Sequence, residues 1–430
     1  MSLLIKNIKE LVGIDPENRR CLRGADMKQL NTLRNAYLYI NEDIIAGFGT
    51  MDQLDRVKLD EKELIQIDAK DKMVFPSFCD SHTHLVYAGS REVEFVDKIR
   101  GLSYEEIAQR GGGILNSARL LHSTSENELY DAAWQRIEEI KRMGTGAVEI
   151  KSGYGLTVED EFKMLRVIKR LKENSALTIR ATFLGAHAFP EEYKDRPDDY
   201  VELIINEMIP RVVAEDLADF IDVFCDRGFF TIEQTEKILK AGKKHGLRAK
   251  IHANELDYSG GVQLGVKYDA LSVDHLECTG DDEINSLIVS DTMPTLLPGA
   301  AFFLEMPFAP ARKMIDAGLG IALATDFNPG SSPSGNMQLI LSMGCIKYRM
   351  LPEEVINAAT INSAYAMGVS DELGSIAVGK RANVFVTKPI SSYAFVPYYY
   401  GHNNVDTIIL NGKIQFKYTH SSFFKNFLKQ

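Results

Sequence analysis

The chain has 430 residues, of which 45% are hydrophobic and 25% charged, so it has the composition of an ordinary globular protein and the length of a large barrel or of two domains. Its formal net charge of −11 argues against a nucleic-acid partner, because such binding needs a basic face. No stretch approaches the roughly 20 consecutive apolar residues of a membrane span, so no membrane partner is expected.

The N-terminal segment, MSLLIKNIKELVGID, carries charges at Lys6, Lys9 and Glu10 and contains no long apolar core. The sequence therefore predicts no signal peptide. The five cysteines are scattered, and no pair has the Cys-x-x-Cys spacing. This usage is typical of a reduced protein, so a cytoplasmic location is expected.

Both ends of the chain have the pattern of short β-strands. Residues 36–49 read as two β-rich runs about an Asn-Glu-Asp turn, and residues 64–68 form an alternating run. Near the other end, residues 382–387 precede the run 406–416, in which Asn411-Gly412 is a strong hairpin signal. Neither end alone has enough strands for a stable sheet, so the two are predicted to pair.

Between the ends, apolar runs alternate with amphipathic helical patterns. The eight apolar runs are residues 74–78, 147–150, 178–184, 220–224, 249–251, 271–273, 293–297 and 321–324. The clearest helical patterns are residues 126–143, 159–172, 200–213 and 231–245. Continuous apolar strands separated by helices indicate a parallel sheet.

Eight such runs make an α/β fold with a (β/α)8 TIM-like barrel the leading prediction. We assign residues 76–375 to the barrel, and residues 1–75 with 376–430 to a small β-sandwich domain built from both termini. A doubly wound open sheet is the alternative. It is disfavoured because no Gly-x-Gly-x-x-Gly follows an early strand.

Polar residues recur directly after the apolar runs. His82 and His84 are separated by one residue, so on a strand both imidazoles would share one face and could hold a divalent ion. His-x-His alone is a weak signal, but it is not isolated. The other residues that follow a run are Lys151, Tyr154, His187, His252, Glu255, His275, Asp326 and Asn328. Since the C-terminal ends of barrel strands converge on one mouth, these residues are predicted to be neighbours.

The order of these residues resembles the amidohydrolase superfamily, with His-x-His after strand one, His after strands five and six, and Asp after strand eight. Within it, the strings SHTHLVYAGSREVEF, RGGGI, EIKSGYGL, TFLGAHAFP, HANE, DHLE, LLPG and LATDFNPGSSP are similar to the imidazolonepropionase family. The resemblance covers essentially the whole chain. The sequence departs from the family at Ser77 and Cys79, where Gly and Val are more usual, and at Asp226, where Glu is more usual.

The resemblance implies hydrolysis of a small-molecule substrate, 4-imidazolone-5-propanoate, to N-formimino-L-glutamate in L-histidine degradation. It implies one metal ion per subunit, zinc or iron, with His82, His84, His252 and Asp326 as ligands. Such an ion lowers the pKa of a bound water to roughly 7.

The resemblance also implies roles for the remaining residues. His275 would polarise the ring carbonyl or orient the water, Asp326 would carry a proton to the leaving nitrogen, and Glu255 would hydrogen-bond the ring nitrogens. Arg91 would hold the propanoate in a bidentate fork. The other predicted substrate-binding residues are Tyr154, His187, Asn328, Gly330 and Ser331.

Several alternatives stay open. Arg91 could pair with Glu92 or Glu94 at the surface, and His275 could be a packed core histidine. Tyr104 is expected to be a helix-face aromatic, and Lys151 to be structural. A deaminase of an aromatic amidine could use the same metal site, and a barrel without activity could act as a scaffold. A homodimer is expected, because twofold symmetry is the commonest assembly.

Overall fold

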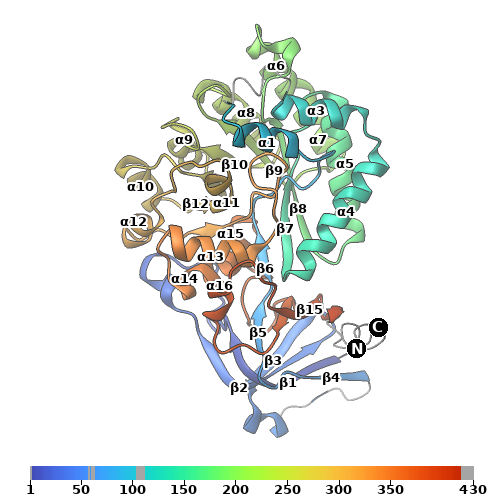
Figure 1. Ribbon diagram of the computed structural model, residues 1–430, viewed down its shortest axis with the longest axis vertical. Helices are drawn as coiled ribbons and strands as arrows, with labels where there is room; N and C mark the ends of the chain where they lie inside the picture. Colours follow the sequence, from blue (N-terminus) through green and yellow to red (C-terminus); the bar gives the residue numbers. More distant parts are fainter. Residues whose placement is uncertain (1, 57–58, 60–62, 103–111, 418–430) are drawn as a thin grey trace.

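The structure is a computed structural model that describes residues 2–56, 59, 63–102 and 112–417. Tyr104 and the first two residues of the RGGGI string lie outside these ranges. Figure 1 shows the helices gathered around one sheet in the upper part of the molecule and a second sheet below it. Within the described ranges, the structure has no helix that combines the length and the apolar character needed to cross a bilayer.

The upper sheet is the predicted parallel barrel. Its strands are β6 (Phe78–Asp80), β7 (Thr145–Lys151), β8 (Thr178–Ala186), β9 (Phe220–Cys225), β10 (Arg248–Ala253), β11 (Ser272–His275), β12 (Met293–Leu296) and β13 (Ala322–Leu323). Each strand pairs in parallel with the next along the chain. A parallel bridge between Thr83 and Phe327 joins the segments that follow β6 and β13. The first and last strand ends therefore meet, and the fold class predicted from the sequence is confirmed.

Helices follow most of the strands and cover the outside of the barrel (Figure 1). They are α1 (Glu92–Ile99), α3 (Ile114–Ser123), α4 (Glu126–Arg142), α5 (Val158–Asn174), α6 (Pro197–Leu203), α7 (Ile209–Ala214), α8 (Ile232–Lys244), α9 (Gly261–Lys267), α10 (Asp281–Ile288), α11 (Pro298–Phe303), α12 (Ala311–Asp316), α13 (Met337–Lys347), α14 (Pro352–Asn357), α15 (Ser363–Ala366) and α16 (Phe395–Tyr398). The helical pattern predicted over residues 126–143 is confirmed as α4, whose start is fixed by a reciprocal capping box between Ser125 and Glu128.

One predicted helix is divided. The pattern over residues 200–213 becomes α6 and α7, separated by the π-helical turn Ile204–Met208. Pro210 has no backbone N–H to donate and its ring crowds the preceding turn, so the regular i→i−4 ladder is interrupted close to this point.

The lower sheet is built from both ends of the chain, as predicted. Its strands are β1 (Ser2–Val12), β2 (Thr32–Asn41), β3 (Ile44–Thr50), β4 (Leu64–Asp68), β5 (Met73–Pro76), β14 (Val384–Thr387), β15 (Val405–Leu410) and β16 (Lys413–Lys417). The two ends meet where β5 pairs antiparallel with β14. β1 pairs with β4 along its first half and with β5 near its end, so the sheet branches there.

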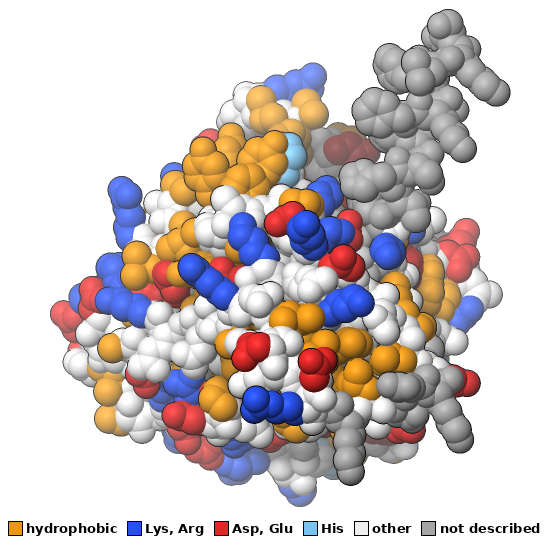
Figure 2. All heavy atoms as spheres, turned by 90° about the horizontal axis from the view of Figure 1, so that it is seen from below, with side chains coloured by type: hydrophobic (Ala, Val, Ile, Leu, Met, Phe, Trp, Pro, Cys, Tyr) orange, Lys and Arg blue, Asp and Glu red, His pale blue; other side chains and the backbone are white. Residues whose placement is uncertain are grey.

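The lower sheet has its own apolar core. Leu38 of β2, Ile45 of β3, Val384 of β14 and Ile409 of β15 are buried in one cluster, so strands from the two ends share one apolar interior. Figure 2 shows the molecule from the side of this sheet, where acidic, basic and apolar side chains are interspersed.

The chain changes sheets at Ser77. The predicted run 74–78 is not a single barrel strand, because β5 ends at Pro76 in the lower sheet and β6 begins at Phe78 in the barrel. The backbone N–H of Ser77 donates to Asn383 O, whereas that of Phe78 donates to Gly144 O. An apolar run gives no sign of this switch, since both halves are buried.

Candidate metal centre and substrate pocket

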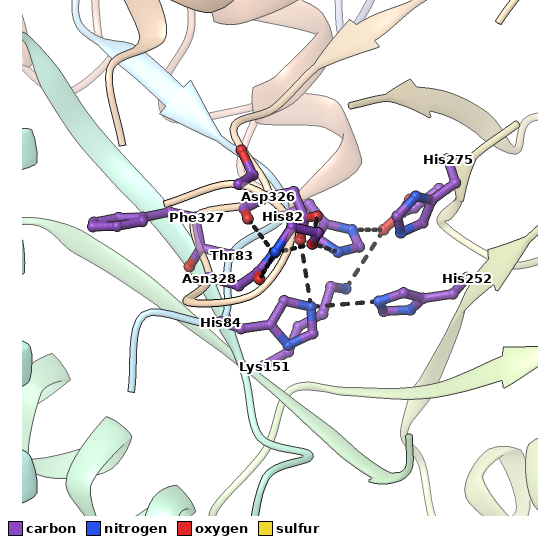
Figure 3. Close-up of polar contacts among 12 residues, drawn as sticks. His82, Thr83, His84, Lys151, His252, His275, Asp326, Phe327 and Asn328 are labelled. Atoms are coloured by element: carbon purple, nitrogen blue, oxygen red, sulfur yellow. Dashed lines mark hydrogen bonds and ion pairs between the residues drawn. The ribbon is translucent and has the colours of Figure 1, made fainter. Parts of the chain in front are cut away.

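Three buried histidines converge inside the mouth of the barrel. His82 and His84 follow β6, and His252 lies on β10; one ring nitrogen from each lies within 4.8 Å of the other two. His84 Nε2 is 3.4 Å from His252 Nε2. Asp326, after β13, places Oδ1 3.5 Å from His82 Nε2 and 3.7 Å from His84 Nε2. Figure 3 shows His82 and Asp326 side by side, with His84 and His252 meeting next to them.

The three histidines, with Asp326 beside two of them, fit a metal ion. A tetrahedral ion with bonds of about 2.0–2.2 Å holds its ligand atoms roughly 3.3–3.6 Å apart, which is close to the 3.4 Å between His84 and His252 and the 3.5 and 3.7 Å from Asp326 to His82 and His84. His82 Nε2 is buried and has no hydrogen-bond partner among the described residues, a costly state unless the nitrogen binds a ligand. Burial lowers the pKa of His82, His84 and His252 well below the usual value, so each keeps a neutral ring with a free lone pair.

Two carboxylates lie beside the histidines in the barrel interior. Asp274 Oδ2 lies 2.7 Å from His82 Nδ1, and a proton on that Nδ1 leaves Nε2 as the lone-pair donor that faces the centre. Asp222 Oδ2 lies 3.0 Å from His252 Nδ1 without the geometry of a hydrogen bond, and Asp222 Oδ1 accepts the His252 backbone N–H at 3.1 Å.

A fully buried lysine joins these carboxylates. Lys151 Nζ lies 2.8 Å from Asp222 Oδ2 and 3.5 Å from Asp274 Oδ2, and it donates to Glu149 at 2.6 Å. Burial alone would lower the pKa of Lys151, but the three carboxylates outweigh it and raise the pKa above its usual value. Lys250 also contacts Glu149 and donates to a backbone carbonyl at 3.0 Å. Lys151 is therefore a charged member of a buried network, in keeping with its predicted structural role.

Asp326 is held by the turn that follows it. Ser331 Oγ donates to Asp326 Oδ2 at 3.2 Å. The amide of Asn328 donates to the Asp326 carbonyl and to Ser331 Oγ, both at 2.7 Å. Its oxygen accepts from the backbone N–H of Gly330 at 2.7 Å and of Ser331 at 2.8 Å. Burial raises the pKa of Asp326 to about 7, against the lowering effect of the bonds from Asn328 and Ser331.

His275 lies beside His82 and His252, and Glu255 lies beside His275. His275 Nδ1 is 3.6 Å from Glu255 Oε2 and 3.8 Å from Glu277 Oε2, too far for a hydrogen bond. His275 has a φ of 86°, a strained conformation of a kind that clusters at active sites. Burial lowers the pKa of His275 to about 4. Burial, with Asp326 and Asp226, raises the pKa of Glu255 to about 8, so Glu255 holds a proton at neutral pH.

Tyr154 and His187 line the side next to His84. The His187 ring stacks on His84 with 5.2 Å between centroids, and the Tyr154 ring lies 5.4 Å from that of His187. His187 Nδ1 donates to the Gly153 carbonyl at 2.9 Å, which leaves its Nε2 free as an acceptor. Glu161 accepts the N–H of Gly153 at 3.1 Å and so fixes the loop that carries Tyr154.

Arg91 caps α1 and is largely buried. It donates through Nε and Nη2 to Glu94 Oε2, at 2.8 and 2.5 Å. One of the two surface pairings that the sequence allowed is thus present, although Glu94 is itself buried. Burial raises the pKa of Tyr154 and lowers that of His187, and the nearby charge of Arg91 lowers both, so the guanidinium lies near these two residues.

Comparison with known proteins agrees with this geometry. Residues 73–415 match the amidohydrolase family. An imidazolonepropionase from Christiangramia forsetii is 55% identical over 414 residues, which span 96% of this chain and 100% of that protein. One from Geobacillus sp. (strain WCH70) is 42% identical over 418 residues, spanning 96% and 98%. The chain belongs to the amidohydrolase family and, within it, to the imidazolonepropionases.

Two solved structures share the amidohydrolase fold with little sequence likeness. Escherichia coli guanine deaminase superposes with a TM-score of 0.72 at 14% identity, covering 97% of this chain and 100% of that one. An adenosine deaminase from Xanthomonas campestris with bound zinc gives a TM-score of 0.71 at 17% identity, covering 96% and 93%. At such identities the likeness concerns the fold alone.

The structure of this amidohydrolase adds residues that the sequence reasoning missed. Three residues were not among the candidates: Asp274, which orients His82; Asp222, which lies beside His252; and Glu94, which binds Arg91. The sequence carries a signal for both aspartates, because Asp222 interrupts the apolar run FIDVFC and Asp274 directly follows the run 271–273. Asp226, the shorter residue at a family Glu position, accepts the backbone N–H of Glu255 at 2.8 Å and so anchors the segment that carries it.

Proposed function

We propose that the chain hydrolyses 4-imidazolone-5-propanoate to N-formimino-L-glutamate in the degradation of L-histidine. The main support for this proposal is the 55% identity to an imidazolonepropionase over 96% of the chain and the whole of that relative. The reaction breaks the ring bond between the carbonyl carbon and its neighbouring nitrogen. The hydroxyl of water goes to that carbon and the remaining proton goes to the released nitrogen.

The four-residue centre supports a metal-dependent reaction. His82, His84, His252 and Asp326 would hold one divalent ion, zinc or iron, which supplies a polarised carbonyl and a water of lowered pKa when bound. Asp326 Oδ1 lies 3.5 Å from His82 Nε2 and 3.7 Å from His84 Nε2, and its Oδ2 accepts from Ser331. Because a carboxylate in this position can accept a proton and pass it on, we assign Asp326 the transfer to the leaving nitrogen.

The remaining groups are assigned to binding and polarisation. His275, neutral at pH 7 because burial lowers its pKa to about 4, can donate one ring N–H to the carbonyl oxygen. Glu255, whose pKa is raised to about 8, can donate its proton to one ring nitrogen while its other oxygen accepts from an N–H. Arg91 would bind the propanoate, and the Tyr154 and His187 rings would flank the substrate.

Asn328, Gly330 and Ser331 form the opposite wall of the proposed pocket. All polar atoms of the Asn328 amide are engaged within its own turn, so we assign it to holding Ser331 and the Gly330 backbone in place. The division into a 76–375 barrel and a domain of residues 1–75 with 376–430, a homodimeric assembly and a cytoplasmic location are retained as proposals. The free state of all five cysteines supports the last of these.

Loss of the imidazolone ultraviolet absorbance tests the proposal. Purified protein should consume imidazolonepropanoate, stop after its metal is removed by a chelator, and recover when zinc or iron is returned. Arg91→Ala should raise KM for imidazolonepropanoate strongly, because it removes the cation that binds the substrate carboxylate. The same substitution should barely affect a purine deaminase, since a purine has no carboxylate. Metal-loaded protein that leaves the substrate untouched but deaminates a purine would contradict the proposal.

A further inference from the structure

Glu94 is a buried carboxylate on α1 to which the proposed reaction gives no role. Its Oε2 accepts hydrogen bonds from Arg91 Nε at 2.8 Å, Arg91 Nη2 at 2.5 Å and the Gly113 backbone N–H at 3.1 Å. Its Oε1 accepts from Asn116 Nδ2 at 3.2 Å. The side chain is only 9% exposed. One carboxylate thus connects the guanidinium to the segment at the start of α3.

Gly330 confines the guanidinium on another side. A Cβ atom placed on Gly330 would lie 2.1 Å from Arg91 Nη1 and 2.8 Å from its Cζ. An arginine tip could usually swing away from such a contact. Here Glu94 holds two of its nitrogens, so the guanidinium keeps its place only because residue 330 has no side chain.

The two neighbours leave one edge of the guanidinium available. A guanidinium has a side edge, formed by Nε and Nη2, and an end edge, formed by Nη1 and Nη2; each can bind a carboxylate in a bidentate fork. Glu94 occupies the side edge. Within the described part of the chain, Nη1 donates no hydrogen bond, so the end edge is the one left for an anion.

We propose that Glu94 is a positioning residue for substrate recognition, which locks the Arg91 guanidinium against Gly330 so that its end edge receives the substrate carboxylate. This inference rests on the proposed function, in which Arg91 binds the propanoate. It predicts that specificity for a carboxylated substrate depends on Glu94, which does not touch the substrate, and on the absence of a side chain at Gly330.

The test compares Glu94→Ala with Glu92→Ala. Glu92 lies on the same helix but is exposed and bonds to Ser90, so its loss should change nothing. Glu94→Ala should raise KM for imidazolonepropanoate about 10- to 100-fold, the range expected for losing a charged hydrogen bond, with kcat within about threefold of wild type.

Gly330→Ala should also raise KM for imidazolonepropanoate, because the new side chain would displace the guanidinium. Glu94→Ala added to Arg91→Ala should have no further effect.

A neutral substrate separates positioning from general stability. With an imidazolone that carries a propyl chain in place of the propanoate, wild type and Glu94→Ala should have the same kcat/KM. A loss of activity that is equal for both substrates, or an unchanged KM for imidazolonepropanoate, would overturn the proposal.

A second readout is independent of the substrate. In protein labelled with 15N-arginine, the Arg91 Nε–H, assigned by its absence in Arg91→Lys, should exchange slowly with water in wild type and Glu92→Ala but rapidly in Glu94→Ala. Rapid exchange in wild type would overturn the positioning role. If wild type fails to open imidazolonepropanoate while this Nε–H is protected, the proposed function fails and the role of Glu94 in fixing Arg91 stands.

Discussion

Asp274 Oδ2 lies 2.7 Å from His82 Nδ1 in the fully buried interior of the barrel. The same carboxylate lies 3.5 Å from Lys151 Nζ. It therefore holds a proton between itself and the imidazole while a lysine balances its charge. This arrangement directs the free nitrogen of His82 to the candidate metal centre and would strengthen it as a ligand.

Asp274→Asn should weaken metal binding. The amide oxygen can still accept the His82 proton, but the negative charge that makes the imidazole a better ligand is lost. We expect zinc affinity to fall about 10- to 100-fold, as is typical when such an outer partner is removed. Competition with a chromophoric chelator measures this. Asp281→Asn, at an exposed helix start, is the matched control, and an affinity equal to that control would contradict the assigned role.

Lys151→Met should destabilise the fold much more than the loss of a surface lysine. It removes the cation shared by Asp222, Asp274 and Glu149 and leaves buried carboxylates without full compensation. We expect the free energy of unfolding to fall by roughly 3–5 kcal/mol, measured by denaturant titration. Lys172→Met, which breaks a partly exposed pair with Asp219, should cost about 1 kcal/mol or less. Equal effects in the two variants would show that the buried network contributes little.

The sequence predicts the barrel well because its signal is hydrophobic and local. Seven of the eight runs correspond to single barrel strands, while the first is divided between two sheets at Ser77. That division depends on partners, Asn383 and Gly144, that are distant in the chain. The branching of β1 between β4 and β5 has the same origin, since a run of residues does not indicate which strand will lie beside it.

The sequence predicts which residues gather at the candidate site, but it does not predict the contacts between them. His82 and His84 are detectable by spacing, and His252 and Asp326 by their place after strands. The contact between Arg91 and Gly330 joins residues from opposite ends of the barrel sequence, so only the folded chain shows that the guanidinium needs a glycine beside it. Likewise, the sequence suggests Glu94 as a possible surface partner of Arg91, but it does not show that the pair is buried.

His187 should make the protein less stable in mild acid. Burial lowers its pKa to about 4, whereas an unfolded histidine titrates near 6.5. Between these values the unfolded chain binds more protons than the native one, so stability is full above pH 6.5 and is lost as the pH falls toward 4, by up to roughly 3 kcal/mol.

The slope of unfolding free energy against pH, measured for wild type and His187→Gln, checks this. The variant should lose part of the acid sensitivity. In 15N-histidine spectra the native ring should stay neutral at pH 6, with its proton on Nδ1, because that atom donates to the Gly153 carbonyl. A His187 that is protonated at pH 6 would contradict the assignment.

Asn328→Ala should lower turnover without removing any group that we assign to the chemistry. The Asn328 side chain makes four hydrogen bonds within the turn, to Asp326, Gly330 and Ser331. Without them Ser331 no longer holds Asp326, and a displacement near 1 Å is enough to reduce kcat/KM by about 100-fold.

Asn328→Asp separates holding the turn from contacting the substrate. An aspartate oxygen still accepts the N–H of Gly330 and Ser331, so the turn should survive in part and activity should be intermediate. A substrate contact made through the amide N–H would be lost equally in both variants. Steady-state kinetics on variants of matched metal content decide whether Asn328 holds the turn or contacts the substrate. Wild-type kinetics in Asn328→Ala would instead show that the backbone bond from Asn328 N to Ser332 O, at 3.0 Å, is sufficient to hold the turn.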